Sequence, residues 1–422
     1  MGVVVPSAFV STGDLESARN ALQTVFDFQR PSGVFPRAGP PYLDAASDTY
    51  HMWTMVGAHN YVLFSGDLAW LARNWAAYRR AMDYICAKVV PGTGVLNATA
   101  TGDWARYVNA PNGSAPSMLL YRTLTTGAFL ADLAPADDSD DDYNDDDASG
   151  PAAGANLAEA WIARAGTLRA AIRTHFWDAA KGAFIDGHRN RTLYPQDSNS
   201  YAVAFGVVDP AGPEAASISR ALTENWTPIG PSSPELPGNV SPFVSSIELE
   251  AHFAAGRADR ALRLVRDSWG WYLGHPNGTG STVIEGYLAD GTFGYRSARG
   301  YTDDPSYVSH AHGWSSGPTS TLTEHLVGLR VTRPAGAGWR LKPAFGEVPE
   351  AQAGFTTTLG RFSARWAVEE GVAAVEWNVP VGTRGWLELG GEEGRWVDGG
   401  KGTARVKVKG TTCGSRSKAQ ET

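Results

Sequence analysis

Residues 14–29, DLESARNALQTVFDFQ, carry the pattern that decides the fold of most of this chain. Asp14 and Glu16 stand where acidic side chains favour the first turn of a helix. Apolar side chains then recur at the spacing of one helix face, at Leu15, Ala18, Leu22, Val25 and Phe26. The stretch therefore predicts an amphipathic helix that buries one side.

The same spacing recurs through residues 1–330, between loops rich in Gly, Pro and Asn. It predicts nine further helices, at 47–64, 68–88, 115–133, 155–176, 198–207, 213–225, 242–255, 257–272 and 310–328. Two boundaries are marked by turn residues: Ser65-Gly66-Asp67 separates the second helix from the third, and Gly256 ends the eighth. We expect a helical domain over residues 1–330.

From Gly338 the pattern changes to apolar and polar residues in alternation, as in FTTTL (355–359), FSARWAV (362–368) and AAVEWNV (373–379). A period of two with short turns between runs indicates antiparallel strands. The sequence predicts a small β-sandwich at about 338–409, within a C-terminal domain of residues 331–409. The polar tail 410–422 is predicted to be disordered.

Composition indicates a globular chain, since 43% of the 422 residues are hydrophobic and 11% aromatic. The net charge of -8 is local, because residues 137–147 hold eight acidic residues and the other 36 acids balance 36 bases. No nucleic-acid partner is implied. The acidic run lacks the spacing of a Ca²⁺-binding EF-hand loop and is predicted to be a solvated, disordered loop.

The sequence has no run of 18 apolar residues, so we expect no membrane span. Its N-terminus lacks the basic region and cleavage site of a signal peptide. Six N-glycosylation sequons nevertheless occur where chance predicts about two, which favours a secreted glycoprotein. They lie at Asn97, Asn112, Asn190, Asn225, Asn239 and Asn277. Cys86 and Cys413 do not indicate whether the protein belongs to an oxidising or a reducing compartment, and a disulfide between them is neither supported nor excluded by the sequence.

Two nearby stretches point to chemistry: GSTVIEGY (280–287) and SHAHGWS (309–315). A carboxylate among small residues, followed by two histidines and a tryptophan, is typical of a sugar pocket in which a base lies beside an aromatic platform. Glu285, with an ordinary pKa of about 4.3, would be ionised as a base must be. The alternative is a helix-capping or loop carboxylate.

Four motifs in order carry a wider resemblance: DTYHMWTM (48–55), TGDW (101–104), STVIEGY (281–287) and HGWSSGPT (312–319). Over about residues 2–380 the chain resembles the fungal branch of the α-L-rhamnosidases of glycoside hydrolase family 78. The resemblance implies a mainly α fold, an (α/α)6 toroid followed by a small antiparallel β-sandwich. Such a toroid has twelve helices, two more than the ten predicted.

The resemblance also implies an inverting reaction on a rhamnose-containing glycoside or polysaccharide. Glu285 matches the family's base, which activates a water across a gap of about 6.5–9.5 Å from a general acid. The family's acid belongs to an Arg- and Asp-rich motif just before the helix that here begins at Gly2. We therefore expect a chain that is truncated at its N-terminus and lacks its own acid and first helices.

The resemblance assigns rhamnose binding to Asp48, Trp53, Asp103, Trp104, His312 and Trp314. Three of these roles have a structural alternative. Asp48 is well placed to cap a helix, Trp104 could pack in the core, and His312 could be a satisfied structural histidine.

The sequence indicates no metal site and no cofactor, since His310 and His312 have no third ligand close by. Two other functions stay open: another toroid glycosidase or glycoside phosphorylase, and a carbohydrate-binding protein without catalysis. The oligomeric state is undetermined.

Overall fold

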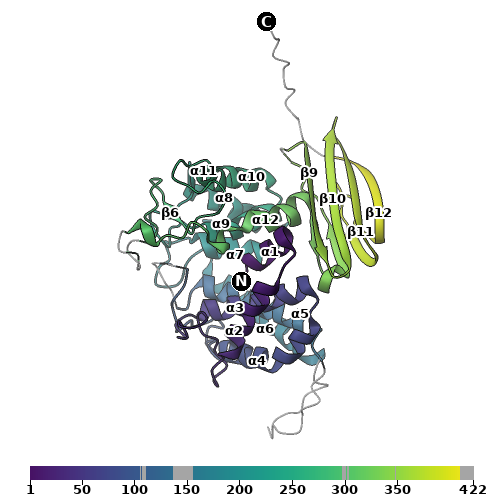
Figure 1. Ribbon diagram of the computed structural model, residues 1–422. Helices are drawn as coiled ribbons and strands as arrows, with labels where there is room; N and C mark the ends of the chain where they lie inside the picture. Colours follow the sequence, from purple (N-terminus) through teal and green to yellow (C-terminus); the bar gives the residue numbers. More distant parts are fainter. Residues whose placement is uncertain are drawn as a thin grey trace.

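The computed structural model describes residues 1–104, 106, 111–135, 155–296, 301, 304–346 and 348–408. It consists of a helical part and a sheet that stands along one side of it (Figure 1). The acidic run 137–147 and the tail 410–422, both predicted to be disordered, lie outside the described residues, as does Cys413.

The helical part begins with six helices: α1 (Val4–Thr12), α2 (Glu16–Asp27), α3 (Asp48–Ser65), α4 (Leu68–Cys86), α5 (Ser114–Ala131) and α6 (Ala155–Phe176). It continues with α7 (Gln196–Ala204), α8 (Pro213–Leu222), α9 (Pro242–Ala254), α10 (Ala258–Leu264), α11 (Trp271–Leu273) and α12 (Gly317–Thr321). All ten helices predicted from periodicity have counterparts, and α1 corresponds to the helix beginning near Gly2 that only the resemblance indicated. Its sequence, VVPSAFVST, is apolar without a clear polar face, because it packs between other elements.

Turn residues end the helices where the sequence indicates. The Ser47 hydroxyl accepts the backbone N–H of Tyr50 and so caps α3. Gly66 then ends α3 in the left-handed conformation, with a φ of 72°. Asp67 caps α4 by accepting the backbone N–H of Trp70 at 2.8 Å. The last predicted helix, 310–328, starts as an α-helix only at Gly317, after a 3-10 turn at Gly313–Ser315.

Six strands form the sheet: β7 (Leu329–Val331), β8 (Gly338–Leu341), β9 (Glu350–Thr357), β10 (Gly360–Glu369), β11 (Val372–Leu387) and β12 (Arg395–Lys407). Their order is β7-β8-β11-β10-β9, and β12 pairs with the remaining edge of β11. The long strand β11 pairs with β10 through its first half and, in parallel, with β8 through its last residues.

Three short two-stranded sheets lie within the helical part: the hairpins β1 (Trp177–Asp178) with β2 (Ala183–Phe184) and β3 (Trp226–Thr227) with β4 (Gly230–Pro231), and the pairing of β5 (Asn239–Val240) with the distant β6 (Tyr287–Leu288). The last of these connects the start of α9 to the loop that carries Glu285. It therefore helps to position the candidate site.

The sheet and the helices share a hydrophobic core. Phe9 of α1 stacks on Phe64 of α3 at 4.4 Å and contacts Phe355 of β9 at 4.8 Å. The Trp366 indole donates to the carbonyl of Leu326 at 3.1 Å. Because α1 lies between helices and sheet, it joins the two parts. No helix in the described part of the chain has the length and apolar character needed to cross a membrane.

Candidate functional site

Glu285 lies in the long loop between α11 and α12, where two stretches of the loop pair with each other. The Glu285 N–H donates to the carbonyl of Ser309 at 2.7 Å, and the His312 N–H donates to that of Val283 at 2.9 Å. The Trp314 indole donates to the Glu285 carbonyl at 2.9 Å. These bonds hold the two motifs that the sequence singled out side by side.

The Glu285 carboxylate is surrounded by hydrogen-bond donors and positive charge, with a side chain that is 2% exposed. The Tyr301 hydroxyl donates to Oε1 at 2.7 Å, and the Ser309 N–H donates to Oε2 at 3.2 Å. A nitrogen of Arg296 lies 3.6 Å from Oε1, and His312 Nδ1 lies 3.8 Å from Oε2. The carboxylate therefore accepts two hydrogen bonds, while the Arg296 and His312 nitrogens lie beyond hydrogen-bond distance.

Arg296 is held at Glu285 by an unusual backbone conformation. Its φ of 62° is in the left-handed region, which is uncommon for residues other than glycine. The Arg296 N–H donates to the Asn239 side-chain oxygen at 3.2 Å, and its guanidinium lies 4.7 Å from the centre of the Tyr301 ring. No local motif marks Arg296, Tyr301 or this use of Asn239, so sequence reasoning missed all three.

Tyr50 of α3 lies within electrostatic reach of Glu285 and also of Asp103, which stands in the loop after α4. Burial raises the pKa of Tyr50 well above its usual range, and the charges of Asp103 and Glu285 raise it further. Burial also raises the pKa of Asp103 to about 6, against the hydrogen bond from the Trp104 N–H. Tyr50 thus lies within reach of the Glu285 carboxylate and of a second carboxyl group, Asp103, whose pKa is raised.

His312 and Trp314 form the accessible side of the site. The His312 side chain is 30% exposed, and its ring centre lies 4.2 Å from that of Trp314. Burial lowers the pKa of His312 below its usual range, and the Glu285 charge opposes this shift. The neutral imidazole can both donate and accept a hydrogen bond, as recognition of a sugar hydroxyl requires.

The predicted tryptophans meet around Phe243 of α9. Its ring centre lies 5.6 Å from that of Trp314, 5.7 Å from Trp53 and 6.4 Å from Trp104. Trp104 is only 1% exposed, and its indole donates to the buried carboxylate of Asp197 at 3.2 Å. The structure therefore places Trp104 in the core, and it corrects the expectation of an apolar wall open to a sugar.

A buried ion network fixes Trp104. Arg106 donates to Asp197 at 2.8 Å and to Asp186 at 2.7 Å, and all three side chains are almost fully buried. Burial and the neighbouring charge of Asp197 raise the pKa of Glu235 to about 8. Sequence reasoning missed this network, because its members are 80 and 91 residues apart.

Asp48 lies apart from these groups. It is fully buried, and Lys88 Nζ lies 2.6 Å from its Oδ1. Its Oδ2 accepts the backbone N–H of Ala100 at 3.1 Å. The expected contact of Asp48 with a sugar is therefore replaced by an internal ion pair. The alternative of an N-cap is also corrected, since Ser47 caps the helix.

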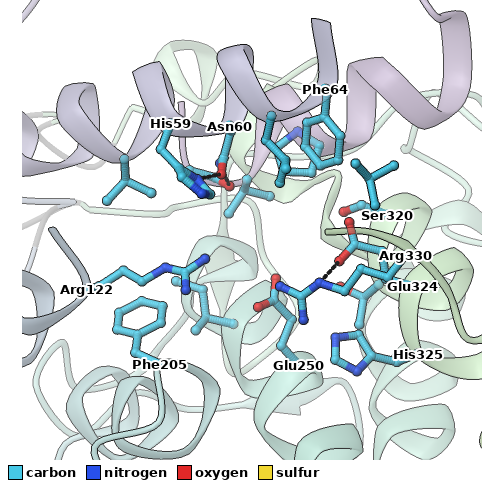
Figure 2. A pocket seen from close by; sticks show the side chains of 18 of the residues that line it. His59, Asn60, Phe64, Arg122, Phe205, Glu250, Ser320, Glu324, His325 and Arg330 are labelled. Carbon is cyan, nitrogen blue, oxygen red and sulfur yellow. Dashed lines mark hydrogen bonds and ion pairs between the residues drawn. The ribbon is translucent and has the colours of Figure 1, made fainter. Parts of the chain in front are cut away.

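A second group of charged side chains lies near the sheet and is called the charged pocket here. Figure 2 shows Arg122 and Arg330 facing the carboxylates of Glu250 and Glu324. Trp53 also lines this pocket, whose volume is about 60 Å³. Such a volume holds a few water molecules, whereas ligand sites span roughly 300–1,000 Å³. The charged pocket is therefore too small for a sugar.

The predicted sequons differ in exposure. Asn112 and Asn277 are exposed, and Asn97 and Asn190 are half-buried. The Asn225 side chain donates to Gln196, and Asn239 is 7% exposed.

The described residues show neither a metal site nor a disulfide. No group of three or more His, Cys, Asp or Glu side chains in that part of the chain is arranged to hold a metal ion. Cys86 is a half-buried free thiol.

Comparisons with known proteins agree with this architecture. Residues 2–227 match the family described as bacterial alpha-L-rhamnosidase 6 hairpin glycosidase domain, and residues 328–404 match the bacterial alpha-L-rhamnosidase C-terminal domain. No curated protein matches the sequence. These matches confirm the predicted fold class, a six-hairpin helical domain followed by a β-rich domain.

Solved structures with a similar fold cover most of the chain at low identity. The family 78 rhamnosidase of Bacillus sp. GL1 covers 87% of it at 21% identity with a TM-score of 0.67. The Streptomyces avermitilis α-L-rhamnosidase, solved with L-rhamnose, covers 96% at 17% identity and 0.67. The Aspergillus terreus α-L-rhamnosidase covers 97% at 16% identity and 0.70. The chain spans 36%, 38% and 45% of their respective lengths.

Proposed function

The chain belongs to the family of bacterial α-L-rhamnosidase six-hairpin glycosidase domains, and we propose that it hydrolyses terminal α-L-rhamnosides with inversion, with Glu285 as the base. One observation carries this proposal. Glu285 is a buried carboxylate with four donors around it, beside the accessible His312 and Trp314.

In the proposed reaction, the water oxygen attacks the anomeric carbon while its proton passes to a Glu285 oxygen. The glycosidic C–O bond breaks, and the departing oxygen takes a proton from a general acid. We assign that acid to no described residue. Tyr301 and Arg296 hold the Glu285 carboxylate in place through contacts at 2.7 and 3.6 Å.

Rhamnose binding is assigned to the groups that share this neighbourhood. His312 and Asp103 would hydrogen-bond sugar hydroxyls, with Asp103 able to donate below about pH 6 and accept above it. The Trp314 ring would support the apolar face of the sugar. Tyr50 joins this set, since the charges of both Asp103 and Glu285 act on it.

The test is Glu285→Gln, assayed with an aryl α-L-rhamnoside and by L-rhamnose binding. The amide keeps the size of the side chain but cannot take the proton, so turnover should fall about 10³-fold while rhamnose affinity stays within a few-fold. Glu369→Gln, the same change at an exposed position in the sheet, is the control. Retained turnover, or a joint loss of turnover and binding, would contradict the assignment.

Export is the second part of the proposal, and it fits the fungal branch that the motifs resemble. The exposed Asn112 and Asn277 are the sequons best placed to carry glycans. After expression through a eukaryotic secretory pathway, peptide-N-glycosidase should lower the mass of the protein. The double variant Asn112→Gln/Asn277→Gln should lose most of that change, and an undiminished change would place the glycans elsewhere.

A further inference from the structure

The face of the sheet turned away from the helices carries a separate hollow. Alternate residues of a strand point to opposite faces. Phe362, Trp366 and Val375 point inward and are buried in the core shared with the helices. The residues between them therefore lie on the outer face, across strands β9, β10, β11 and β12, which run side by side in Figure 1.

The hollow has a volume of about 810 Å³, far larger than the charged pocket and within the range of ligand sites. Its floor is the row in which Gly354 pairs with Ser363, Ser363 with Asn378, and Asn378 with Lys401. A Cβ on Gly354 would lie 2.7 Å from the Phe362 carbonyl oxygen, so this position accepts only glycine. The small side chains at 354 and 363 keep the floor low.

The lining is polar and carries positive charge that nearby carboxylates do not balance. Arg365 donates two hydrogen bonds to Glu376, at 2.9 and 2.7 Å, so the charges of these two side chains neutralise each other. Arg361 and Lys401 also line the hollow, and neither has a carboxylate partner among the described residues. The hollow is thus cationic although the chain as a whole has a net charge of -8.

The remaining groups suit sugar hydroxyls. The Gln352 and Asn378 amides and the Ser363 hydroxyl each offer both donors and acceptors. Neighbouring strands lie about 4.8 Å apart, so four strands span about 14 Å, enough for a short run of sugar rings. On the same strand as Lys401, the Trp396 ring is 57% exposed, 5.2 Å from Trp386, and offers an apolar surface of the kind on which sugars stack.

We propose that this hollow is a glycan-binding site for a carboxylated polysaccharide. The carboxylates of the polymer would pair with Arg361 and Lys401, and its hydroxyls with the amides and Ser363. Such a site would keep the protein on an acidic glycan while the Glu285 site acts elsewhere on the molecule. It requires no turnover at Glu285, so it stands or falls separately from the proposed reaction.

Native gel electrophoresis of the full chain tests this proposal, with polygalacturonate, its methyl ester, double-stranded DNA or no polymer in the gel. We expect retardation by polygalacturonate alone, weakening with added salt. Arg361→Gln/Lys401→Gln should weaken binding about tenfold and leave turnover of an aryl α-L-rhamnoside unchanged. Arg189→Gln/Arg191→Gln removes the same charge from an exposed loop of the helical part and is the control.

Three results would overturn the proposal. They are no retardation of the wild-type chain, equal weakening by the control variant, and equal retardation by DNA, which would show only general attraction to polyanions. Glu285→Gln should be retarded like the wild type. Loss of turnover with retained retardation would therefore support both assignments independently.

Discussion

The Glu285 site and the charged pocket contain the same kinds of side chain and differ in their access. Each combines carboxylate, arginine and histidine. At Glu285 these groups come from loops, and His312 is 30% exposed. In the charged pocket they come mainly from packed helical segments, which enclose a cavity of about 60 Å³ (Figure 2). A cluster of charges is therefore a poor guide to a sugar site unless a sugar can reach it.

Burial strongly shifts the pKa values of the histidines and of Glu250 in the charged pocket. Burial lowers the pKa of both His59 and His325 to about 3 in the charged pocket. Burial, and then the charge of Glu324, raises the pKa of Glu250 to about 7. Both histidines are thus neutral at any ordinary pH, while Glu250 changes charge near neutrality. This behaviour affects folding stability, whereas His312, whose side chain is 30% exposed, is open to a ligand.

The strongest test of the comparison sets Glu250→Gln beside Glu285→Gln. The substitution is the same, but only Glu285 is placed to take a proton from water. We expect turnover of an aryl α-L-rhamnoside to fall about 10³-fold for Glu285→Gln and less than about threefold for Glu250→Gln. Equal losses would end the distinction between the two regions.

Asp48→Asn separates scaffold from site. Asp48 is fully buried against Lys88 at 2.6 Å, so removing its charge should lower the free energy of unfolding by about 3 kcal/mol, measured in urea. Asp44→Asn, which breaks an exposed pair with Arg37, should cost less than about 1 kcal/mol. The KM of folded Asp48→Asn should not change, and a raised KM with normal stability would return Asp48 to the sugar site.

The pH dependence of stability tests the charged pocket. The pKa of Glu250 is about 7 when folded against an ordinary 4.5, so the folded chain holds the extra proton between these values. The free energy of unfolding should therefore fall as pH rises from about 4.5 to 7. Glu250→Gln removes this loss, which should amount to on the order of 2 kcal/mol between pH 5 and 8.

The measurement is urea unfolding of the wild type and the variant at each pH. The exposed Glu16→Gln is the control, and it should keep the wild-type slope. Parallel slopes for wild type and Glu250→Gln would show that Glu250 does not titrate in this range.

The smallest expected effect is that of Tyr301→Phe. It removes one hydrogen bond of 2.7 Å to the Glu285 carboxylate, which should lower kcat about tenfold and leave the affinity for L-rhamnose within twofold. Tyr307→Phe is the matched control, since Tyr307 is 68% exposed and packs on Tyr301 without touching Glu285. Equal kcat values for the two variants would remove Tyr301 from the site.

Much of the fold follows from local pattern. Helical periodicity located ten helices, and alternation located β9, β10 and part of β11, because burial of one face leaves a period in the sequence. The helix α1 leaves no such period. The central position of β11 in the sheet could not be predicted from the sequence either. Its pairing with β8, β10 and β12 depends on how the strands pack and not on the residues of β11 alone.

The candidate site also contains some residues that the sequence could bring together and others that it could not. Glu285, His312 and Trp314 lie within 30 residues of one another, and one loop joins them, so their proximity could be anticipated from the sequence. Arg296 and Tyr301 lie in the same loop but carry no motif. Their roles depend on a left-handed turn held by Asn239, a contact across 57 residues.

Asp48 and Tyr50 show what only the tertiary structure decided. The sequence by itself placed both at the start of one helix, within one motif. Residues two apart on a helix point about 200° apart, so only one of them can face a given neighbour. Packing turned Asp48 toward Lys88 and Tyr50 toward Asp103 and Glu285. Periodicity fixes which residues form a helix, but its rotation depends on distant elements packed against it.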